Sequence, residues 1–362
     1  MDGHRRDTTT SGAGREDSSG TLDEALDRLH ASGPEFEGWL SNHGPMAVEA
    51  LVRHGQAPSV HRWIDHYEDK LDELPGRYSP VTDANWREAL GDARRLGDWV
   101  RFFTRTVEEQ PWQDVLATWW PRLLPGISGG ATHPVIRTGH AVRALLSEGG
   151  ESAPRRAELA HALGYWAARH SSLPPFAPLP AGASAEEGLD AVPLVADQSS
   201  GIRARLARIT ALPQRPRQTD GEGADPETAR RDLEEIVRAA THRYATHAHG
   251  SPVMLVHAAT APNAVLRTLP ALPRTLWPLS VDAAWAASAA VTAVYGPAQG
   301  TPVPSDGGLP PQEAFARAAA HGDEHAIKFA DTALDVAFRR GGEDPPAMAA
   351  ALRATELIEP MR

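Results

Sequence analysis

The chain has 362 residues, of which 41% are hydrophobic and 23% charged, an ordinary balance for a globular protein. Its net charge of −11 argues against a nucleic-acid backbone as the main partner. Because cysteine is absent, disulfides, thiolate nucleophiles and cysteine-ligated metal sites are excluded. A metal site would have to use His, Asp, Glu or a modified side chain.

The first 20 residues are polar, and they lack the apolar core of a secretory signal. We predict that residues 1–20 form a disordered tail and that residues 21–362 form the ordered domain of a cytoplasmic protein. No apolar stretch reaches the roughly 18 residues that a membrane helix needs, so we expect no membrane segment.

Apolar residues recur at helical spacing along most of the chain, which predicts a succession of amphipathic helices. The expected helices begin near residue 22 and then cover 46–52, 60–71, 85–107, 112–124, 133–146, 158–170, 227–246, 252–267, 281–294, 311–321 and 325–339. The weakly periodic segments 171–193 and 214–226 are expected to be long loops. Strand patterns are scarce, so we predict an all-α fold: a multi-helix single domain with long loops.

Sequence motifs of several common enzyme classes are missing. The chain has no G-x-G-x-x-G after a strand, no G-x-x-x-x-G-K-[ST] and no H-E-x-x-H. Their absence argues against a Rossmann dinucleotide site, a P-loop and a zinc peptidase.

Histidines in apolar or glycine-rich contexts at the expected helix junctions are candidate metal ligands, because neutral imidazole is the commonest protein ligand for metals. They are His43, His133, His140, His257, His321 and His325. His133 and His140 are seven residues apart, about two helical turns, so both can face one side. If residues 321–328 form one helix, His321 and His325 share a face. Taken singly, each could equally be a core histidine bonded to the backbone.

Lysine is rare in this chain. Of the 36 basic residues, only Lys70 and Lys328 are lysines, and Lys328 follows His325 by three positions. A buried lysine can lose its proton and act as a base or nucleophile, which arginine cannot do. Its neutral amine can also take up carbon dioxide to give a carbamate, an oxygen ligand for metals. The alternative is a surface lysine without a special role.

Charged neighbours of the histidines allow two interpretations each. Arg137 can bind an anionic or phenolate oxygen through paired donors, or it can neutralise a carboxylate on a neighbouring helix. Asp323 and Glu324 can orient metal-bound histidines, or they can cap the helix that begins near residue 325.

Several stretches of the chain, in the same order, resemble the questin oxidase family. They are Asn42-His43-Gly44-Pro45-Met46, residues 121–126, residues 131–145, Val256-His257-Ala258 and His321-Gly-Asp-Glu-His325-Ala-Ile-Lys328. The resemblance runs from about residue 22 to about residue 334, and its central and final stretches are the most specific. Fungal members of this family oxidise anthraquinones in polyketide pathways, with opening of the quinone ring.

The resemblance implies a particular metal site. The family was long described as NADPH-dependent and of Baeyer–Villiger type, and it is similar to atypical non-haem iron dioxygenases. In that view four histidines and a carboxylated lysine hold Fe(2+), and the matching positions here are His43, His133, His257, His325 and Lys328. His140 and His321 are reserve ligands and, with Arg137, candidate catalytic residues. Pro134 departs from the glycine expected in relatives, and the weakly patterned segment 171–226 leaves the substrate pocket undefined.

We therefore expect a non-haem iron oxygenase that opens or oxygenates a ring of a polycyclic aromatic, a quinone-type polyketide of secondary metabolism, with O2 as co-substrate. Three alternatives stay open. The first is an NADPH-dependent Baeyer–Villiger-type oxidase, the second is a metal-dependent hydrolase that uses the same His/Lys site, and the third is a non-enzymatic helical binding protein. The oligomeric state stays open too.

Overall fold

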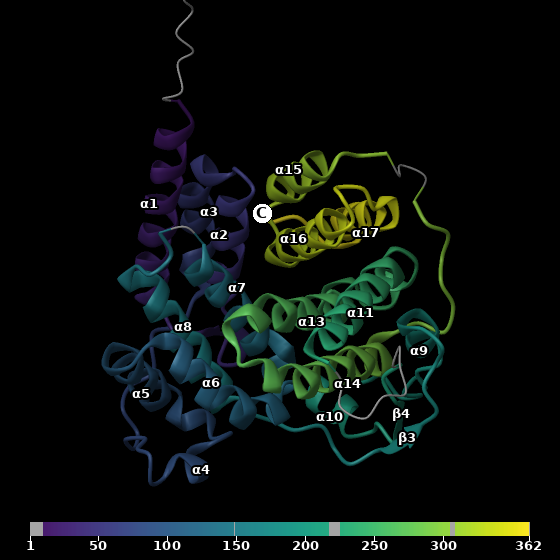
Figure 1. Cartoon of the computed structure of the whole chain (residues 1–362), viewed down its shortest axis with the longest axis horizontal. Coiled ribbons are helices and arrows are strands. Elements are labelled where there is room, and N and C mark those ends of the chain that lie inside the picture. The colour runs from purple at the N-terminus through teal and green to yellow at the C-terminus, as the bar shows by residue number, and fades with distance from the viewer. Residues whose placement is uncertain (1–9, 148, 217–224, 305–307, 362) are drawn as a thin grey trace, which may run out of the picture.

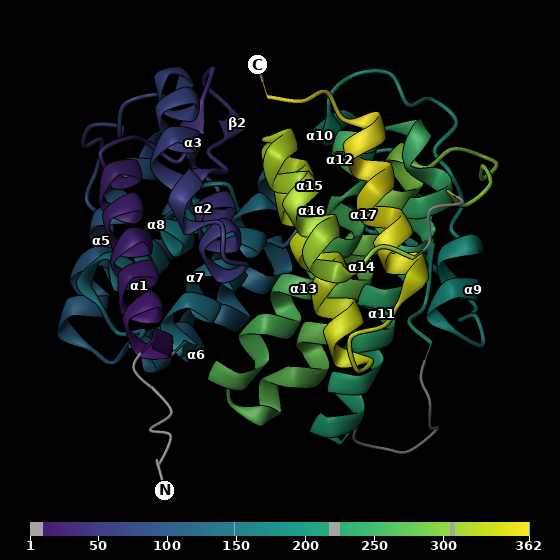
Figure 2. The same cartoon turned by 90° about the horizontal axis from the view of Figure 1, so that it is seen from above.

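The computed structural model describes residues 10–147, 149–216, 225–304 and 308–361. Figure 1 shows two groups of helices side by side, with the N-terminal group on the left, and Figure 2 shows the same division from above. The predicted all-α fold is confirmed: helices account for most of the described residues, and strands there form two short pairs.

The N-terminal group contains the first eight helices. They are α1 (Thr10–His30), α2 (Gly44–Arg53), α3 (Val60–Tyr67), α4 (Trp86–Ala89), α5 (Leu96–Glu109), α6 (Trp112–Leu123), α7 (His133–Leu146) and α8 (Ala153–Ala168). Residues 1–9 of the predicted tail lie outside the described residues, and α1 begins at Thr10, earlier than the expected start near residue 22. The division into a tail and a domain stays a prediction.

The C-terminal group contains the remaining helices. They are α9 (Ala185–Asp190), α10 (Ile202–Leu206), α11 (Pro226–His247), α12 (Pro252–Leu255), α13 (His257–Thr268), α14 (Trp277–Tyr295), α15 (Pro311–His321), α16 (Glu324–Arg339) and α17 (Pro345–Leu357). Of the two segments expected to be loops, the first, 171–193, contains helix α9. Residues 217–224 of the second lie outside the described residues.

The two strand pairs are short. β1 (Glu35–Phe36) and β2 (Leu40–Ser41) pair antiparallel and lead directly into α2. β3 (Ala177–Leu179) pairs in parallel with β4 (Ala211–Pro213), so that the ends of the weakly patterned segment are tied together. Figure 1 shows this pair beside α9 and α10 at one edge of the C-terminal group.

One predicted helix, 85–107, is divided in the structure into α4 and α5. The break falls at Gly91, whose φ of +80° lies in the left-handed region that glycine adopts without strain. The Gly91 N–H donates to the carbonyl of Ala167 at 2.8 Å, so the break also ties this segment to α8. Helical periodicity continued across the break, which is why the sequence predicted one helix.

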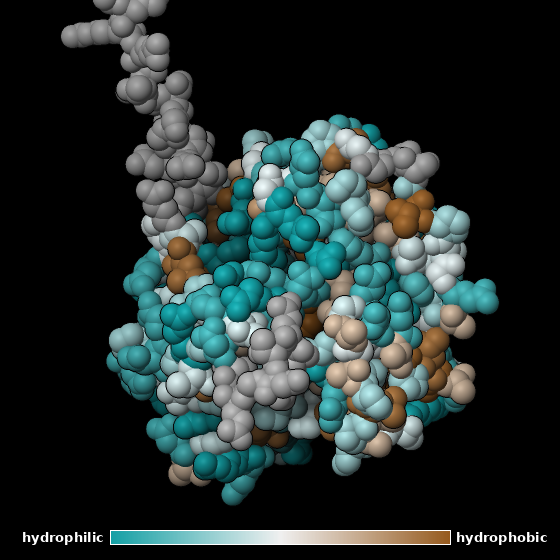
Figure 3. All heavy atoms as spheres, turned by 45° about the vertical axis from the view of Figure 1, so that its right-hand side comes forward, coloured by the Kyte–Doolittle hydropathy of each residue, from teal (hydrophilic) through white to brown (hydrophobic). Residues whose placement is uncertain are grey.

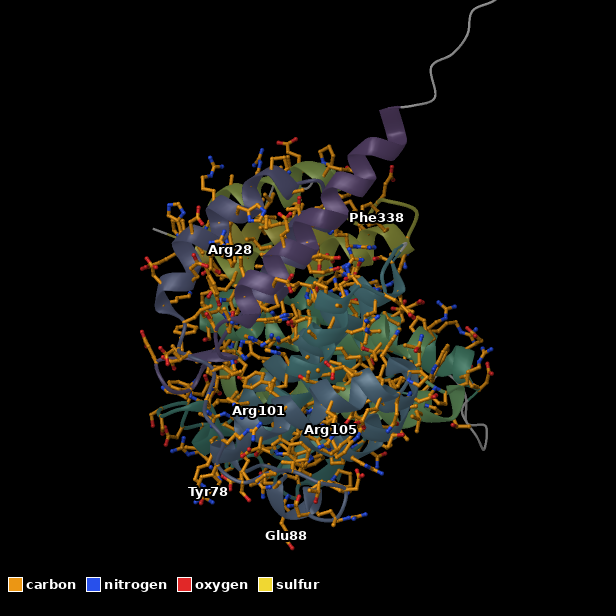
Figure 4. All side chains as sticks on the ribbon, turned by 90° about the vertical axis from the view of Figure 1, so that its left-hand side faces the viewer. Arg28, Tyr78, Glu88, Arg101, Arg105 and Phe338 are labelled. Atoms are coloured by element: carbon orange, nitrogen blue, oxygen red, sulfur yellow. The ribbon has the colours of Figure 1, made fainter. Side chains whose placement is uncertain are left out.

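Helix α5 illustrates how the sequence pattern becomes packing. Trp99, Phe102 and Phe103 face the core, with the ring of Trp99 stacked on that of Phe103 at 5.7 Å. On the opposite face Arg105 is 56% exposed and projects into solvent (Figure 4). Burial of such aromatic faces is the main favourable term that holds the helices together.

The face of the molecule in Figure 3 is largely hydrophilic, and hydrophobic side chains form small separate patches on it. Single exposed apolar residues, such as Trp39 and Val303, are normal for globular proteins. Within the described residues, every helix is too short or too polar to traverse a lipid bilayer. The predicted cytoplasmic location stays a prediction.

Helices α7 and α13 lie side by side at the centre of the molecule. A Cβ atom at Gly139 of α7 would lie only 2.6 Å from the Cα of Ala264 on α13 and 2.7 Å from its carbonyl oxygen. Both residues lie about two turns beyond the first residue of their helices, His133 and His257. The two helices therefore run in the same direction, and this close contact sets the distance between their first residues.

We expect the substitution Gly139→Ala to destabilise the fold by about 1–3 kcal/mol, because the added methyl group forces the two backbones apart. Urea unfolding followed by circular dichroism measures the change. The matched control is Gly76→Ala, where a Cβ would meet open space. Equal stability of the two variants would contradict the close contact.

Candidate metal centre

Four histidines from distant parts of the chain meet where the two groups of helices join. They are His43, His133, His257 and His325, hereafter the histidine cluster, and their ligand atoms all lie within 4.8 Å of one another. The ring of His43 lies 4.5 Å from that of His133 and 4.4 Å from that of His325, centre to centre. The structure thus brings together four of the six candidate histidines, the four for which the family resemblance implies a ligand role.

Each histidine of the cluster lies at the beginning of a helix. His43 is the N-cap of α2, His133 and His257 are the first residues of α7 and α13, and His325 is the second residue of α16. Helix N-termini carry a partial positive charge. Their convergence favours neutral imidazoles, and it favours a negatively charged ligand beside them.

Two of the histidines have defined tautomers. Nδ1 of His133 lies 2.6 Å from the carbonyl oxygen of Gly130, and Nδ1 of His257 lies 3.0 Å from that of Met254. A carbonyl only accepts, so each Nδ1 carries the proton and each Nε2 presents a lone pair. The two Nε2 atoms lie 2.9 Å apart. Metal–nitrogen bonds of about 2.1 Å to one ion would span this separation.

A strained turn presents one of these carbonyls. Gly130, Ala131 and Thr132 have φ values of +51°, +53° and +68°, and the last two are left-handed non-glycine residues. Such residues cost roughly 1–2 kcal/mol each and persist where the surrounding structure requires them. The turn ends at His133, and Pro134 follows in the first turn of α7, where the missing N–H has no helical partner to lose. The departure from glycine at Pro134 is therefore compatible with the helix.

Lys328 reaches the same point from α16. Its side chain is fully buried, and its Nζ lies 3.1 Å from Nε2 of His257. Burial lowers the pKa of Lys328 to about 7, although Glu324 and Asp323 partly oppose the shift. Near neutral pH a large fraction of this lysine is therefore the neutral amine.

Three imidazoles of the cluster are uncharged in this setting. Burial, followed by the positive charge of Lys328, lowers the pKa of His43, His133 and His257 well below the usual histidine value. A neutral imidazole is the form that binds a metal. These three histidines are thus in their ligand form at physiological pH.

Several buried polar atoms near the cluster lack a hydrogen-bond partner among the described residues. They are Nδ1 and Nε2 of His43, Nδ1 of His325, Oγ1 of Thr132, Oγ1 of Thr260 and Nη1 of Arg137. Thr132 precedes His133, and Thr260 lies one turn beyond His257. Buried polar atoms in native proteins are nearly always paired, so this concentration fits a site built for a ligand. The donor set, four imidazoles and one lysine, fits a divalent transition metal.

Arg137, on α7, is only 2% exposed and is held by Glu158 of α8. Its Nε and Nη2 donate to the two carboxylate oxygens at 2.6 and 2.7 Å. The guanidinium therefore neutralises a carboxylate on a neighbouring helix, which is one of the two interpretations of the sequence. Nη1 stays unpaired among the described residues, and binding of an anionic oxygen by Arg137 stays a prediction.

His140 belongs to a second buried cluster, hereafter the ion network. Its members come from α2, α7, α13 and α16 and are Glu49, His140, Arg143, Arg267, Asp331 and Asp335. Nδ1 of His140 donates to Glu49 at 2.7 Å, and Arg267 donates to its Nε2 at 3.1 Å. Both ring nitrogens are therefore occupied within the network, two turns along α7 from His133.

His321 lies apart from the cluster. Gly322, with φ of +84°, ends α15 directly after His321, and Asp323 begins the next helix as its N-cap. The separate helices expected at 311–321 and 325–339 are thus observed, and His321 and His325 do not share one helix. Nε2 of His321 pairs with the carbonyl of Ile358 at 3.0 Å, which holds the C-terminal segment.

Some residues near the cluster were not predicted to belong to the site. Lys70 lies at its edge, with Nζ 3.2 Å from Oε1 of Glu324, and that same oxygen lies 3.8 Å from Nδ1 of His43. Both lysines of the chain therefore lie at this site. The rarity of lysine in the sequence could have indicated both residues, but only Lys328 was predicted to belong to the site. The carboxylates and arginines of the ion network also went unrecognised.

These features define an all-helical protein with a buried, histidine-rich candidate metal centre. The chain belongs to the questin oxidase-like family, whose sequence profile matches residues 40–333. That range contains the whole histidine cluster and Lys328. The family description indicates an enzyme of the oxidase type. A search of curated proteins gives no match to this chain.

We expect Arg143→Met to destabilise the protein by about 3–5 kcal/mol, because it removes the arginine that pairs with buried Glu49 and one of the two arginines that pair with buried Asp331. The free energy of unfolding in urea measures this. Arg105→Met, on the exposed face of α5, is the matched control and should change stability by less than about 0.5 kcal/mol. A small effect at both positions would contradict the importance of the network.

The pairing of Arg137 predicts an acid-sensitive contribution to stability. Burial alone would raise the pKa of Glu158, but Arg137 outweighs it and holds the pKa at about 2, below the ordinary 4.5. A depressed folded-state pKa stabilises the fold above pH 4.5, and this stabilisation is lost as the pH falls from 4.5 toward 2. We expect Glu158→Gln to have a shallower decline of unfolding free energy over this window, measured by urea unfolding. Parallel curves would contradict the pairing.

Proposed function

We propose that this protein is a non-haem iron oxygenase that oxidises a polycyclic aromatic of the quinone type, with O2 as co-substrate and Fe(2+) held by the histidine cluster and Lys328. The observation that carries the proposal is the convergence of four imidazoles and one lysine at a single buried point. Such donors suit iron(II) and zinc alike. Membership of the questin oxidase-like family favours oxidative chemistry, and hence iron, and it supports an anthraquinone-type substrate.

Lys328 would act as an oxygen ligand after carboxylation. Its neutral amine can attack carbon dioxide, so that a C–N bond forms, a proton is released and a carbamate results. The lowered pKa of Lys328 makes the amine available, and the helix N-termini around it favour the negative charge that forms. The carbamate would add an anionic donor to four neutral ones.

Arg137 is the candidate for binding a substrate oxygen. Glu158 fixes two of its nitrogens, and Nη1 is left to donate to a phenolate or quinone oxygen. For His140 and His321, which were predicted as catalytic, the contacts favour positioning roles. His140 helps to hold α7 through the ion network, and His321 holds the C-terminal segment.

A bound ferrous ion would supply the electrons through which O2 can react with a closed-shell aromatic. The chain's own residues hold the ion, keep the imidazoles neutral and limit access of water, since every residue of the cluster is largely buried. An NADPH-dependent Baeyer–Villiger-type oxidation and a zinc-dependent hydrolysis at the same residues are the competing proposals.

The decisive experiment is anaerobic purification followed by elemental mass spectrometry. We expect about one iron per chain, and we expect the iron-loaded protein to consume O2 with a dihydroxyanthraquinone in the absence of NADPH. His133→Ala should lose the iron, whereas His61→Ala, at a surface position 44% exposed, should retain it.

Other outcomes point elsewhere. Zinc in place of iron, with hydrolytic activity that needs no O2, would favour the hydrolase. Oxygen uptake only when NADPH is added would favour the Baeyer–Villiger-type oxidase. No metal after reconstitution with ferrous ion would overturn the proposal and leave the histidines as core residues.

A further inference from the structure

We propose that Glu324 is a positioning residue that holds the Nδ1–H of His43 and thereby directs the Nε2 of that histidine toward a metal. The inference rests on the proposed metal-binding function of the histidine cluster. It assigns to a carboxylate outside the cluster the task of orienting one ligand and raising its donor strength.

The geometry places Glu324 on one side of His43. Oε1 of Glu324 lies 3.8 Å from Nδ1 of His43, and the two side chains are only 8% and 5% exposed. Neither ring nitrogen of His43 has another hydrogen-bond partner in the described part of the chain. A movement of about 1 Å would bring the carboxylate and Nδ1 to hydrogen-bond distance.

The other three histidines show the same arrangement at Nδ1. His133 and His257 are held there by backbone carbonyls, and Nδ1 of His325 lies 3.5 Å from Oδ1 of Asp323. In each case a protein oxygen faces Nδ1, so Nε2 is left as the ligand atom. A metal-bound histidine ordinarily donates its second ring N–H to such a partner. On this proposal Glu324 accepts the Nδ1–H of His43, as backbone carbonyls accept the Nδ1–H of His133 and His257.

The two adjacent acidic residues have different tasks. Oδ1 of Asp323 accepts from the backbone N–H groups of His325 and Ala326 at 2.8 and 3.2 Å, so Asp323 caps α16. Glu324 makes no such cap and points to the start of α2, where His43 lies. The sequence left both roles open for both residues, and the structure assigns one to each.

Lys70 keeps Glu324 in place. Its ammonium lies 3.2 Å from Oε1 of Glu324 and 4.1 Å from the centre of the Tyr67 ring, so it supplies the positive charge that a buried carboxylate requires. The hydroxyl of Tyr67 accepts the backbone N–H of His43 at 2.6 Å. The same short segment, residues 67–70, therefore holds the backbone of His43 directly and its ring through Glu324.

The test is the affinity of the metal-free full-length protein for Co2+ and the visible absorption spectrum of the Co2+-loaded protein. We expect Glu324→Ala to weaken Co2+ binding about 10- to 100-fold and to change the spectrum, because one imidazole becomes a weaker and less ordered donor. Glu324→Gln keeps an oxygen but not the charge, so its affinity should fall between those of the parent and Glu324→Ala.

Asp69→Asn is the matched control, because it removes one acidic charge from an exposed position beside Lys70. It should bind Co2+ as the parent does. The thermal midpoint of each metal-free variant shows whether folding is intact. If Glu324→Ala does not fold, the near-isosteric Glu324→Gln decides: its weaker binding and altered spectrum support the proposal, and parent-like behaviour overturns it.

The outcomes separate this inference from the proposed function. Stoichiometric Co2+ binding by the parent, with unchanged affinity and spectrum in both Glu324 variants, would overturn the role of Glu324 and leave the metal centre standing. Failure of the parent to bind Co2+ at all would overturn the metal centre and this inference with it.

Discussion

The arrangement of the histidine cluster depends on the ion network that lies about two turns further along the same four helices. Each of α2, α7, α13 and α16 carries a histidine at its start and a charged member of the network six to ten residues later. Asp331 alone accepts from Arg143, Arg267 and His54 at 2.6–3.0 Å. Burying these charges is costly unless every partner is in place, so the network specifies one relative position of the helices. The relative position of the four helices in turn determines where the histidines at their N-terminal ends lie.

The ion network and the histidine cluster are both buried, but their side chains differ in charge. Burial opposes charge everywhere, but arginines beside Glu49 and Asp331 outweigh it and hold the pKa of each carboxyl well below its ordinary value. In the histidine cluster burial, followed by the positive charge of Lys328, lowers the pKa of His43, His133 and His257 well below the ordinary histidine value. The carboxylates and arginines of the ion network are therefore ionised, while these three imidazoles are neutral and able to bind a cation.

Local sequence patterns were sufficient for much of the architecture, and helical periodicity predicted most helices. Apolar or glycine-rich contexts indicated six candidate histidines, and it was the resemblance to the questin oxidase family that selected the four that cluster. The ion network was not predicted, because its pairs join residues that are far apart in the sequence, such as Arg143 and Asp331. The sequence of either helix does not indicate which residue of another helix is the partner. The left-handed turn before α7 was not predicted. Of its three residues only Gly130 is of a type that favours this conformation, and Ala131 and Thr132 are not. The helix end at His321 was predicted, and Gly322 is a usual helix terminator.

If the histidine cluster holds a divalent metal, as proposed, charge balance explains why residue 328 is a lysine. Imidazole ligands would leave the charge of such an ion uncompensated in a buried site, and four helix N-termini add to the positive potential. The carboxylate of Glu324 is already shared with Lys70. The Nζ of Lys328 lies 3.1 Å from the Nε2 of His257, and an arginine at this position would keep its positive charge beside the proposed metal. Lysine can give up its proton there, and as a carbamate it would turn a positive charge into a negative one. In a chain that otherwise uses arginine almost throughout, the proposed function would therefore require a lysine at this position.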